Sequence, residues 1–451
     1  MGTKATKADG VQVFGMVVDI SYSAPHSREV LGHAYGRRVA SFRETACPVF
    51  SVIGTATANL LGDTDPRGLG SRRVGHRQIP VIAFAQDWRR TRLCWHTVAT
   101  MSSVHPRILS VGTANPPGYY SQGDILEMFR VANPMVRSMF KASHIEGRHL
   151  VLPEAGEDGV PREDQDALLR KHRKWSLKLG GEAIARALDD AGLRADEVDY
   201  LCCITSTGLM LPGLTAMFIK HLGFRVDCHR ADLVGMGCNA GLNGLNPTAN
   251  WCRANPGRTA LMVCCEVNSA LYVYDDTMAT GVVNSLFGDG CAAVVLRAED
   301  PGETLVPAIE DFYSHIIPDA WGAMRYNWTP EHGKFSFYLD RDVPYVLGIH
   351  AETPVNGLLS RNGLKRRDID HWIIHSGGKK VIDAIKYNIG ITAHDVRHTV
   401  DILRKFGNLG SGSFLFSYQR LMAEGCVEPG DRCVMMTMGP GSTIETALLH
   451  W

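Results

Sequence analysis

The chain has 451 residues, of which 45% are hydrophobic and 21% are charged, so it is long enough to bury two cores or one large duplicated core. Its 47 basic residues balance 47 acidic ones, which argues against nucleic acid or an anionic membrane as a partner and favours a small molecule. No apolar run approaches the roughly 20 residues that cross a bilayer, and the N-terminus lacks the apolar core of a signal peptide.

Residues 1–100 differ in pattern from the rest of the chain. Scattered Arg, Gly and Thr interrupt short apolar stretches, and basic pairs stand at 72–73 and 89–90. The first clear strand pattern, 107–114, follows shortly after Met101. We expect the first hundred residues to be either a poorly ordered extension or an over-extended gene start, and we favour the second interpretation.

From there the sequence alternates amphipathic stretches with β-rich apolar runs. A helical pattern covers 166–191, and a strand pattern follows at 200–205. This alternation predicts an α/β layered fold. The cysteine pairs at 202–203 and 264–265 lie inside such apolar runs without the C-x-x-C spacing of zinc sites or dithiol switches, so we expect buried free thiols, no metal site and a reducing cytoplasm.

Three short segments of the first half recur in the same order in the second half. The members of the first matched pair each lead into an apolar strand, although each segment alone is short enough to match by chance. Together they predict an internal duplication, with halves at 101–325 and 326–451 that share one site. The matched segments are 192–201 with 363–372, 256–264 with 429–437, and 288–295 with 439–446.

Cys238 stands where an apolar strand end meets a Gly-x-Gly turn and then a run of small residues and leucines compatible with a helix. A thiol at a helix N-terminus feels the positive end of the helix dipole, which lowers its pKa and favours the nucleophilic thiolate. The small neighbours resemble those of the serine elbow of hydrolases, where they let an acyl group approach. The alternative is a buried structural cysteine.

His375 ends the strand that belongs to the duplicated pattern, and two glycines follow it. A histidine at this strand end, facing the elbow of the other half, could pair with the thiolate and donate to a developing oxyanion. A purely structural histidine is the alternative.

Asn408 lies in a glycine-flanked turn before an apolar helix, so its amide could be an ordinary helix cap. Together with Cys238 and His375, however, it completes a set that can load an acyl group, decarboxylate malonate and hold the resulting enolate with two hydrogen-bond donors.

At these motifs the chain resembles the chalcone synthase superfamily of type III polyketide synthases, from about Arg107 to Trp451. Within it the chain is most similar to the bacterial 3,5-dihydroxyphenylacetyl-CoA synthases, which supply the dihydroxyphenylglycine unit of glycopeptide antibiotics. The stretches that carry this closer match are 234–243, 283–290, 375–383 and 436–445.

The resemblance implies a homodimeric, internally duplicated thiolase fold with five αβαβα layers. It makes Cys238 the acyl-carrying nucleophile, and His375 and Asn408 the residues of decarboxylation and condensation. It also implies that no cofactor is needed beyond the coenzyme A thioesters that serve as substrates. Enzymes of dehydratase or hydratase type would act downstream.

The resemblance further assigns residues around the substrate. Phe287 matches the gatekeeper phenylalanine of the family, and Phe337 matches its second gate. Leu211 occupies the place from which plant members send a methionine across the dimer interface, a near-isosteric exchange. The loop Gly439, Pro440, Gly441 matches the one that shapes the cyclisation cavity, whereas the basic CoA-binding residues of plant members are matched only loosely.

The expected reaction joins malonyl-CoA, as starter and extender, through four units, and closes a ring to the dihydroxyphenylacetyl-CoA skeleton. One rival is another type III or a fatty-acid-initiation condensing enzyme, which normally holds its histidine in a His-Gln-Ala-Asn setting rather than in the His-Ser-Gly-Gly of residues 375–378. The other rival is a non-catalytic thiolase-fold subunit that binds a polyketide chain, and such subunits usually lose the nucleophile.

Overall fold

The computed structural model describes residues 104–154, 157, 161, 163–300, 302 and 304–451, together with four short strands in the first hundred residues. The chain divides into two compact units, Met1–Ser102 and Ser103–Trp451. In the first, β1 (Val11–Val13) pairs with β2 (Met16–Val18), and β3 (Ala56–Thr57) pairs with β4 (Gln78–Ile79). Apart from these strands, the predicted extension lies outside the described residues.

The larger unit is built on nine hydrogen-bonded strands in the order β15-β16-β17-β12-β5-β11-β10-β8-β9. Most are continuous buried runs, as expected of strands covered on both faces, and all eight residues of β10 are buried. The expected strands at 107–114 and 200–205 are confirmed by β5 and β8. The nine strands are β5 (Pro106–Ala114), β8 (Tyr200–Thr205), β9 (His229–Val234), β10 (Thr259–Glu266), β11 (Gly290–Ala298), β12 (Ala308–Ile316), β15 (His371–Ile374), β16 (Arg432–Gly439) and β17 (Thr443–His450).

The strand pairing repeats in two parts of this sheet. β8 is parallel to β10, which is antiparallel to β11, which is antiparallel to β5. In the same way β15 is parallel to β16, which is antiparallel to β17, which is antiparallel to β12. The two parts meet at a single residue pair, Arg107 with Ala308. The recurring sequence segments lead into or lie in equivalent strands, while the division at residue 325 stays a prediction.

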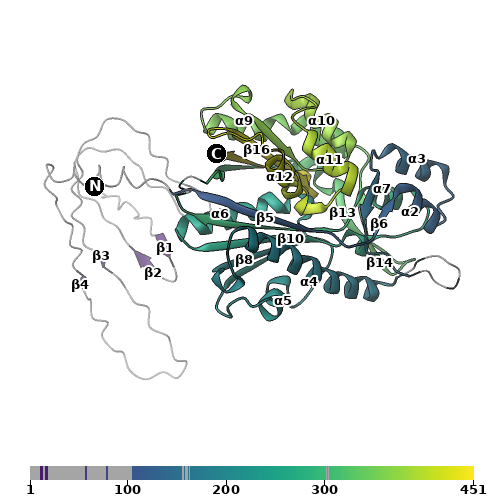
Figure 1. Cartoon of the computed structure of the whole chain (residues 1–451), viewed down its shortest axis with the longest axis horizontal. Helices are drawn as coiled ribbons and strands as arrows, with labels where there is room; N and C mark the ends of the chain where they lie inside the picture. The colour runs from purple at the N-terminus through teal and green to yellow at the C-terminus, as the bar shows by residue number, and fades with distance from the viewer. Residues whose placement is uncertain are drawn as a thin grey trace, which may run out of the picture. The chain divides into compact units, whose positions relative to one another are not determined.

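Helices form three further layers around these two parts, as Figure 1 shows. The expected helix over 166–191 is confirmed by α4, which begins after Asp164, whose carboxylate accepts the N–H of Ala167 at 2.7 Å. Two helices contact strands of both parts and form the middle layer. The outer helices of the first part are α4 (Gln165–Asp190) and α5 (Leu214–His221), the middle ones are α6 (Ala240–Ala254) and α12 (Ser413–Glu424), and the second part adds α8 (Val343–His350), α9 (Glu352–Arg361), α10 (Lys379–Ile389) and α11 (Arg397–Phe406).

Smaller elements gather beside one end of the sheet (Figure 1). Residues of several of these elements line the cavity described below. A hairpin of β13 and β14 packs against α7, and α7 packs against α3. These elements are β6 (Tyr119–Ser121), α2 (Gln122–Met128), α3 (Pro134–Ala142), β7 (Gly147–His149), α7 (Met278–Leu286), β13 (Met324–Thr329) and β14 (Lys334–Leu339).

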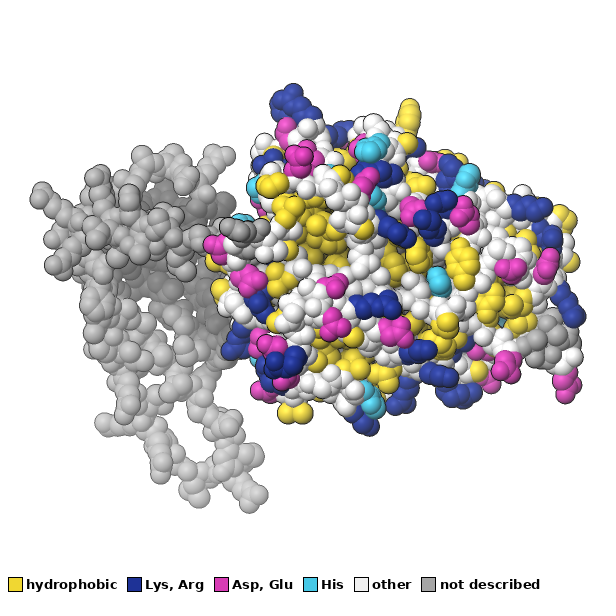
Figure 2. Space-filling view, viewed as in Figure 1, with side chains coloured by type: hydrophobic (Ala, Val, Ile, Leu, Met, Phe, Trp, Pro, Cys, Tyr) yellow, Lys and Arg dark blue, Asp and Glu magenta, His cyan; other side chains and the backbone are white. Residues whose placement is uncertain are grey.

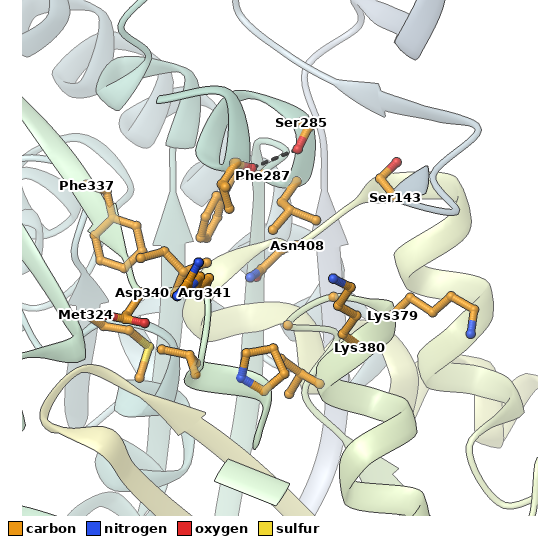
Figure 3. A pocket seen from close by; sticks show the side chains of 18 of the residues that line it. Ser143, Ser285, Phe287, Met324, Phe337, Asp340, Arg341, Lys379, Lys380 and Asn408 are labelled. Carbon is orange, nitrogen blue, oxygen red and sulfur yellow. Dashed lines mark hydrogen bonds between the residues drawn. The ribbon is translucent and has the colours of Figure 1, made fainter. Parts of the chain in front are cut away.

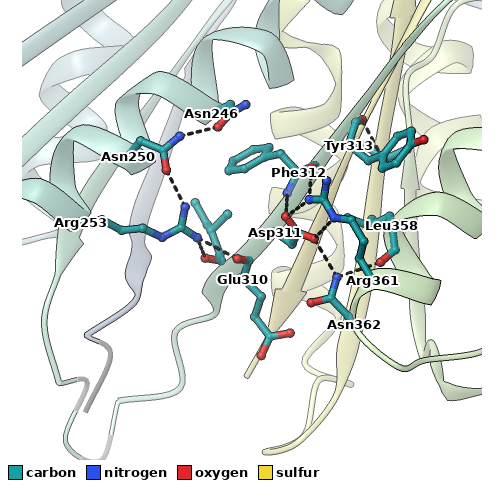
Figure 4. A network of polar contacts seen from close by, with 12 residues as sticks. Asn246, Asn250, Arg253, Glu310, Asp311, Phe312, Tyr313, Leu358, Arg361 and Asn362 are labelled. Carbon is teal, nitrogen blue, oxygen red and sulfur yellow. Dashed lines mark hydrogen bonds and ion pairs between the residues drawn. The ribbon is translucent and has the colours of Figure 1, made fainter. Parts of the chain in front are cut away.

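A polar network connects helices to β12 at its bulge, close to where the two parts of the sheet meet (Figure 4). Arg253 of α6 donates to the carbonyls of Ile309 and Glu310 at 2.6 and 2.9 Å. On the other side Arg361 of α9 pairs with Asp311. Arg361 also donates to the Phe312 carbonyl at 2.7 Å. Both arginines therefore satisfy backbone carbonyls beside the bulge, so a middle helix and an outer helix of the second part contact the same strand.

The visible face of the larger unit carries interspersed acidic and basic side chains with hydrophobic ones between them (Figure 2). This mixture agrees with the balance of 47 basic and 47 acidic residues in the whole chain. Among the described residues, no helix is both long and apolar enough to cross a membrane.

Candidate active site

The predicted strand-turn-helix elbow around Cys238 is confirmed. After β9, Gly235 and Gly237 adopt φ of +79° and +75°, a short 3-10 helix η2 (Gly237–Asn239) follows, and α6 begins at Ala240. A side chain at 237 would be strained, and its Cβ would lie 2.4 Å from Cδ of Pro440. The Gly237 N–H donates to the Ser206 hydroxyl at 2.7 Å, which fixes the turn.

His375 follows β15 directly and is 2% exposed. Its backbone N–H donates to the Met436 carbonyl at 2.8 Å, so the sheet register extends to this residue. The ring Nδ1 is hydrogen-bonded to the Ser413 hydroxyl at 2.5 Å, which leaves Nε2 for other partners. Burial lowers the imidazole pKa to about 3, so the ring is neutral near pH 7.

Asn408 is held by its backbone and its side chain together. Its N–H donates to the Leu286 carbonyl at 2.8 Å, and its carbonyl accepts the Gly288 N–H at 3.0 Å. The amide Oδ1 accepts the Gly410 N–H at 2.9 Å, which turns Nδ2 toward the Cys238 sulfur, 4.0 Å away. The amide therefore serves a local turn with its oxygen and presents its N–H groups to the thiol.

Cys238, His375 and Asn408 line one cavity of about 680 Å³. Phe287 and Phe337 line it too, with ring centroids 5.7 Å apart and planes at 89°, the edge-to-face arrangement. Figure 3 shows Phe337 on one side of this cavity, Lys379 and Lys380 on the other, and Asn408 between them. The structure thus brings together five of the residues that the sequence singled out.

The remaining sequence candidates lie elsewhere. Leu211 is 99% exposed, just before α5. Gly439 ends β16 against the elbow, where an added Cβ would lie 2.4 Å from Oδ1 of Asn239. Pro440 packs on Gly237, and Gly441 has a φ of +78°. This loop therefore backs the elbow, and neighbouring Met438 is the residue that lines the cavity.

The expectation of a lowered thiol pKa is wrong for this structure. Burial, and then the charge of Glu266, raise the pKa of Cys238 to about 12, against the smaller lowering effect of the Asn408 hydrogen bond. The cysteine is only half-buried as a residue, but its sulfur lies among aromatic and apolar side chains. Without substrate the cavity is lined by a neutral thiol and a neutral imidazole.

Glu266 is a residue of this site that sequence reasoning missed. It ends β10 at 1% exposure and lines, with Cys238, a small cavity of about 30 Å³, room for a water molecule. Its carboxylate accepts the Ser206 N–H at 2.9 Å and the Ser411 hydroxyl at 2.6 Å. Burial raises its pKa to about 7. The available signal was a carboxylate at the end of an otherwise apolar strand.

Cationic side chains at the mouth of the large cavity were also missed. Lys379, Lys380 and Arg341 all line it. Lys379 pairs with Asp383, and Arg341 lies 3.9 Å from Asp342, while no described carboxylate pairs with Lys380. The mouth can therefore bind an anionic group.

Two family models match the chain in consecutive regions. Residues 97–301 match the N-terminal domain of chalcone and stilbene synthases, and residues 359–451 match the C-terminal domain of 3-oxoacyl-[acyl-carrier-protein (ACP)] synthase III. The second match concerns the rival condensing-enzyme class, so the C-terminal region alone does not separate the two.

Similarity over about three quarters of the chain does separate the two classes. A 3,5-dihydroxyphenylacetyl-CoA synthase of Streptomyces toyocaensis is 53% identical over 77% of this chain and 90% of its own length. One of Amycolatopsis balhimycina is 50% identical over 76% and 93%. The crystal structure of 1,3,6,8-tetrahydroxynaphthalene synthase from Streptomyces coelicolor A3(2), a bacterial type III polyketide synthase, superposes with a TM-score of 0.71 at 28% identity, covering 76% of this chain and 99% of that one. The predicted thiolase-type α/β fold is confirmed.

Proposed function

Because the chain belongs to the chalcone and stilbene synthase family and is a type III polyketide synthase, we propose that it condenses malonyl units from malonyl-CoA and closes them to 3,5-dihydroxyphenylacetyl-CoA. The observation that carries the proposal is the Asn408 amide aimed at the Cys238 sulfur, in the cavity that His375 also lines. The product is proposed from the names of relatives at 50–53% identity.

Loading is the first step. The Cys238 sulfur attacks the thioester carbonyl of malonyl-CoA while Nε2 of His375 takes the thiol proton. The carbon-sulfur bond to coenzyme A then breaks, and the departing thiolate receives this proton from His375. A thiol pKa raised to about 12 means that the proton leaves during the attack rather than before it. His375 is suited to this task because Ser413 fixes its ring by Nδ1.

Decarboxylation and condensation follow. A malonyl group that loses carbon dioxide leaves its electron pair as an enolate, whose oxygen accepts from Asn408 Nδ2 and from Nε2–H of His375. This donor is the neutral tautomer in which Nδ1 accepts from the Ser413 hydroxyl, so the ring proton moves from Nδ1 to Nε2 after loading. The enolate carbon then attacks the thioester on Cys238, and the same region holds the new oxyanion. Collapse of this oxyanion breaks the carbon-sulfur bond to Cys238, which leaves as a thiolate and can accept the lengthened chain from coenzyme A. Donors fixed by Gly410 and Ser413 need no reorganisation when this charge develops.

The wider cavity divides into a mouth and an inner chamber in this proposal. Phe287 and Phe337 stand between them as gates that admit the pantetheine arm and exclude the bulk of coenzyme A. Lys380 and Arg341 at the mouth contact its phosphates. Lys380→Glu should raise KM for malonyl-CoA with little change in kcat, whereas Lys220→Glu on α5, also exposed, should leave both unchanged.

A homodimer belongs to the proposal as well. Leu209 and Leu211 are 82% and 99% exposed, which is costly for a loop of this apolar character unless a second copy covers it. A cytoplasmic location and downstream pathway enzymes stay proposals; the ten described cysteines, all free, favour a reducing compartment.

Product analysis tests the proposed function. Malonyl-CoA alone should give an aromatic thioester with the mass and fragmentation of 3,5-dihydroxyphenylacetyl-CoA, and Cys238→Ala should give none. A fatty-acid-initiation enzyme would instead need an acyl starter and a carrier protein. A non-catalytic subunit would release no carbon dioxide from malonyl-CoA.

A further inference from the structure

Arg148 of β7 is an entirely buried cation, with 0% of its surface exposed. Its guanidinium donates through Nη1 to the carbonyls of Asn284 and Phe287 at 2.7 and 2.8 Å, and to the Tyr272 hydroxyl at 2.9 Å. Nη2 donates to Oε1 of Gln122 at 2.8 Å. None of these partners is a carboxylate. A buried charge without a counter-ion is costly, so its surroundings must supply negative potential in another form.

The C-terminal end of α7 supplies that potential. The last carbonyls of a helix have no partner inside it and carry the negative end of its dipole. Here Arg148 takes the carbonyls of Asn284 and Phe287, Gln122 donates to that of Ser285 at 2.8 Å, and the Tyr272 hydroxyl also donates to Phe287. Arg148 is thus a buried cap of α7.

Two parts of the proposed site are connected to this end of α7. Phe287, the gate, follows α7 directly. Its backbone forms a β-bridge with Asn408, made of the bonds from Asn408 N–H to Leu286 and from Gly288 N–H to Asn408. The Arg148 stem fills the space beside the bridge, since a Cβ on Gly407 would lie 2.8 Å from its Cδ.

We propose that Arg148 is a positioning residue that holds the Phe287 gate and the Asn408 amide as one unit, through the cap of α7. This inference rests on the proposed function for its catalytic consequence. Arg148 lines neither of the cavities that contain Cys238, so it acts through Phe287 and Asn408 rather than on substrate. Any displacement of the helix end moves the gate and the enolate donor together.

The test compares full-length Arg148→Met and Arg148→Lys with Tyr272→Phe, which removes one of the two donors to the Phe287 carbonyl and keeps the ring. Leu358→Ala, buried in α9 of the other part, is the control for a general loss of stability. Hydrogen exchange is followed in peptides covering 284–289 and 405–410. Intact-protein mass spectrometry measures acyl-Cys238, and carbon dioxide release is measured per acyl-enzyme.

In Arg148→Met both peptides should exchange faster together, and decarboxylation per acyl-enzyme should fall on the order of 100-fold, the cost of a displacement of about 1 Å. Acylation of Cys238 should change only a few-fold. Arg148→Lys, which keeps the charge with fewer donors, should recover part of the loss, and Tyr272→Phe should show a smaller effect in the same direction.

Wild-type exchange in both peptides, faster exchange in only one, or a loss equal to that in Leu358→Ala would overturn the proposal. If Arg148→Met does not fold, the same readouts on Arg148→Lys and Tyr272→Phe decide it. If the wild-type enzyme makes no product from malonyl-CoA, the proposed function fails, and hydrogen exchange alone still decides whether Arg148 holds the two segments.

Discussion

The two middle helices begin in the same way but carry different chemistry. α6 is preceded by the 3-10 turn η2, with Gly237 at a φ of +75°, and α12 is preceded by η6 (Gly410–Gly412), with Gly410 at a φ of +63°. The second residue is Cys238 in one turn and Ser411 in the other. Cys238 faces the large cavity, whereas Ser411 is fully buried and donates to Glu266.

This difference explains why the proposed function assigns only one nucleophile to a duplicated framework. Both turns can present a side chain at a helix start, but Ser411 is turned inward to hold a carboxylate beside the other elbow. Asn408, two residues before Gly410 of η6, supplies the donor that faces Cys238. In the proposed function one elbow carries the acyl chain and the other organises its surroundings.

The largest contrast is expected from removing each turn's central side chain. Cys238→Ala should show no condensation above background and no labelling by iodoacetamide at that position. Ser411→Ala should keep most of its turnover, with an unfolding free energy lower by about 1–3 kcal/mol because the Glu266 carboxylate loses a buried donor. Steady-state assays and denaturant melts measure both. Equal inactivation of the two variants would break the comparison.

The next largest effect is expected on decarboxylation when the Asn408 donor, which precedes the second elbow, is removed. Asn408→Ala should still accept an acyl group at Cys238 but lose about 100- to 1,000-fold in decarboxylation, the usual cost of one preorganised oxyanion donor. His375→Ala should lose more, since it also removes the group that takes the thiol proton. Carbon dioxide release from labelled malonyl-CoA is the measurement. Release at the parent rate would reduce Asn408 to its turn-forming role.

A smaller effect is expected on the pKa of Cys238 when the charge of Glu266 is removed. The charge of Glu266 contributes, after burial, to the raised pKa of Cys238. Removing that charge in Glu266→Gln should lower the thiol pKa, so the pH profile of iodoacetamide alkylation should move to lower pH. Ser411→Ala, which keeps the carboxylate, is the control and should not move it downward. A profile that shifts upward in Glu266→Gln would contradict this electrostatic link.

The sequence predicted the layered α/β architecture and the strand-turn-helix elbow, because these are local patterns in a duplicated order. It also singled out Cys238, His375 and Asn408, which line one cavity. It did not predict the raised thiol pKa. That value arises from burial by Phe287 and Phe337, which lie 49 and 99 residues away in the chain, and from Glu266 on another strand. The sequence did not single out Arg148, because its burial depends on the end of α7.

The smallest expected effect is on the pH dependence of stability. Each part of the fold contains a buried histidine that bears on it. Burial lowers the pKa of His172 on α4 to about 4 and that of His375 to about 3. An unfolded histidine titrates near 6.5, so below that pH the unfolded state binds more protons and stability falls as pH decreases toward 4.

The unfolding free energy of the parent protein should fall between pH 7 and pH 4.5. In His172→Gln this acid loss, the fall in unfolding free energy, should be smaller by about 1–3 kcal/mol. Urea melts at the two pH values give the difference. The exposed His144→Gln is the matched control and should leave the acid loss unchanged. An acid loss that is the same in His172→Gln and the parent would show that this imidazole is not held neutral.

Peptide mapping of the acylated enzyme tests the central claim most directly. The protein is incubated with malonyl-CoA, quenched in acid during turnover, digested, and searched for acyl masses on every cysteine and serine peptide. We predict that acyl groups of increasing length are found on the peptide containing Cys238 and not on the one containing Ser411. Acyl groups on another residue, or turnover with Cys238 unmodified, would contradict the account.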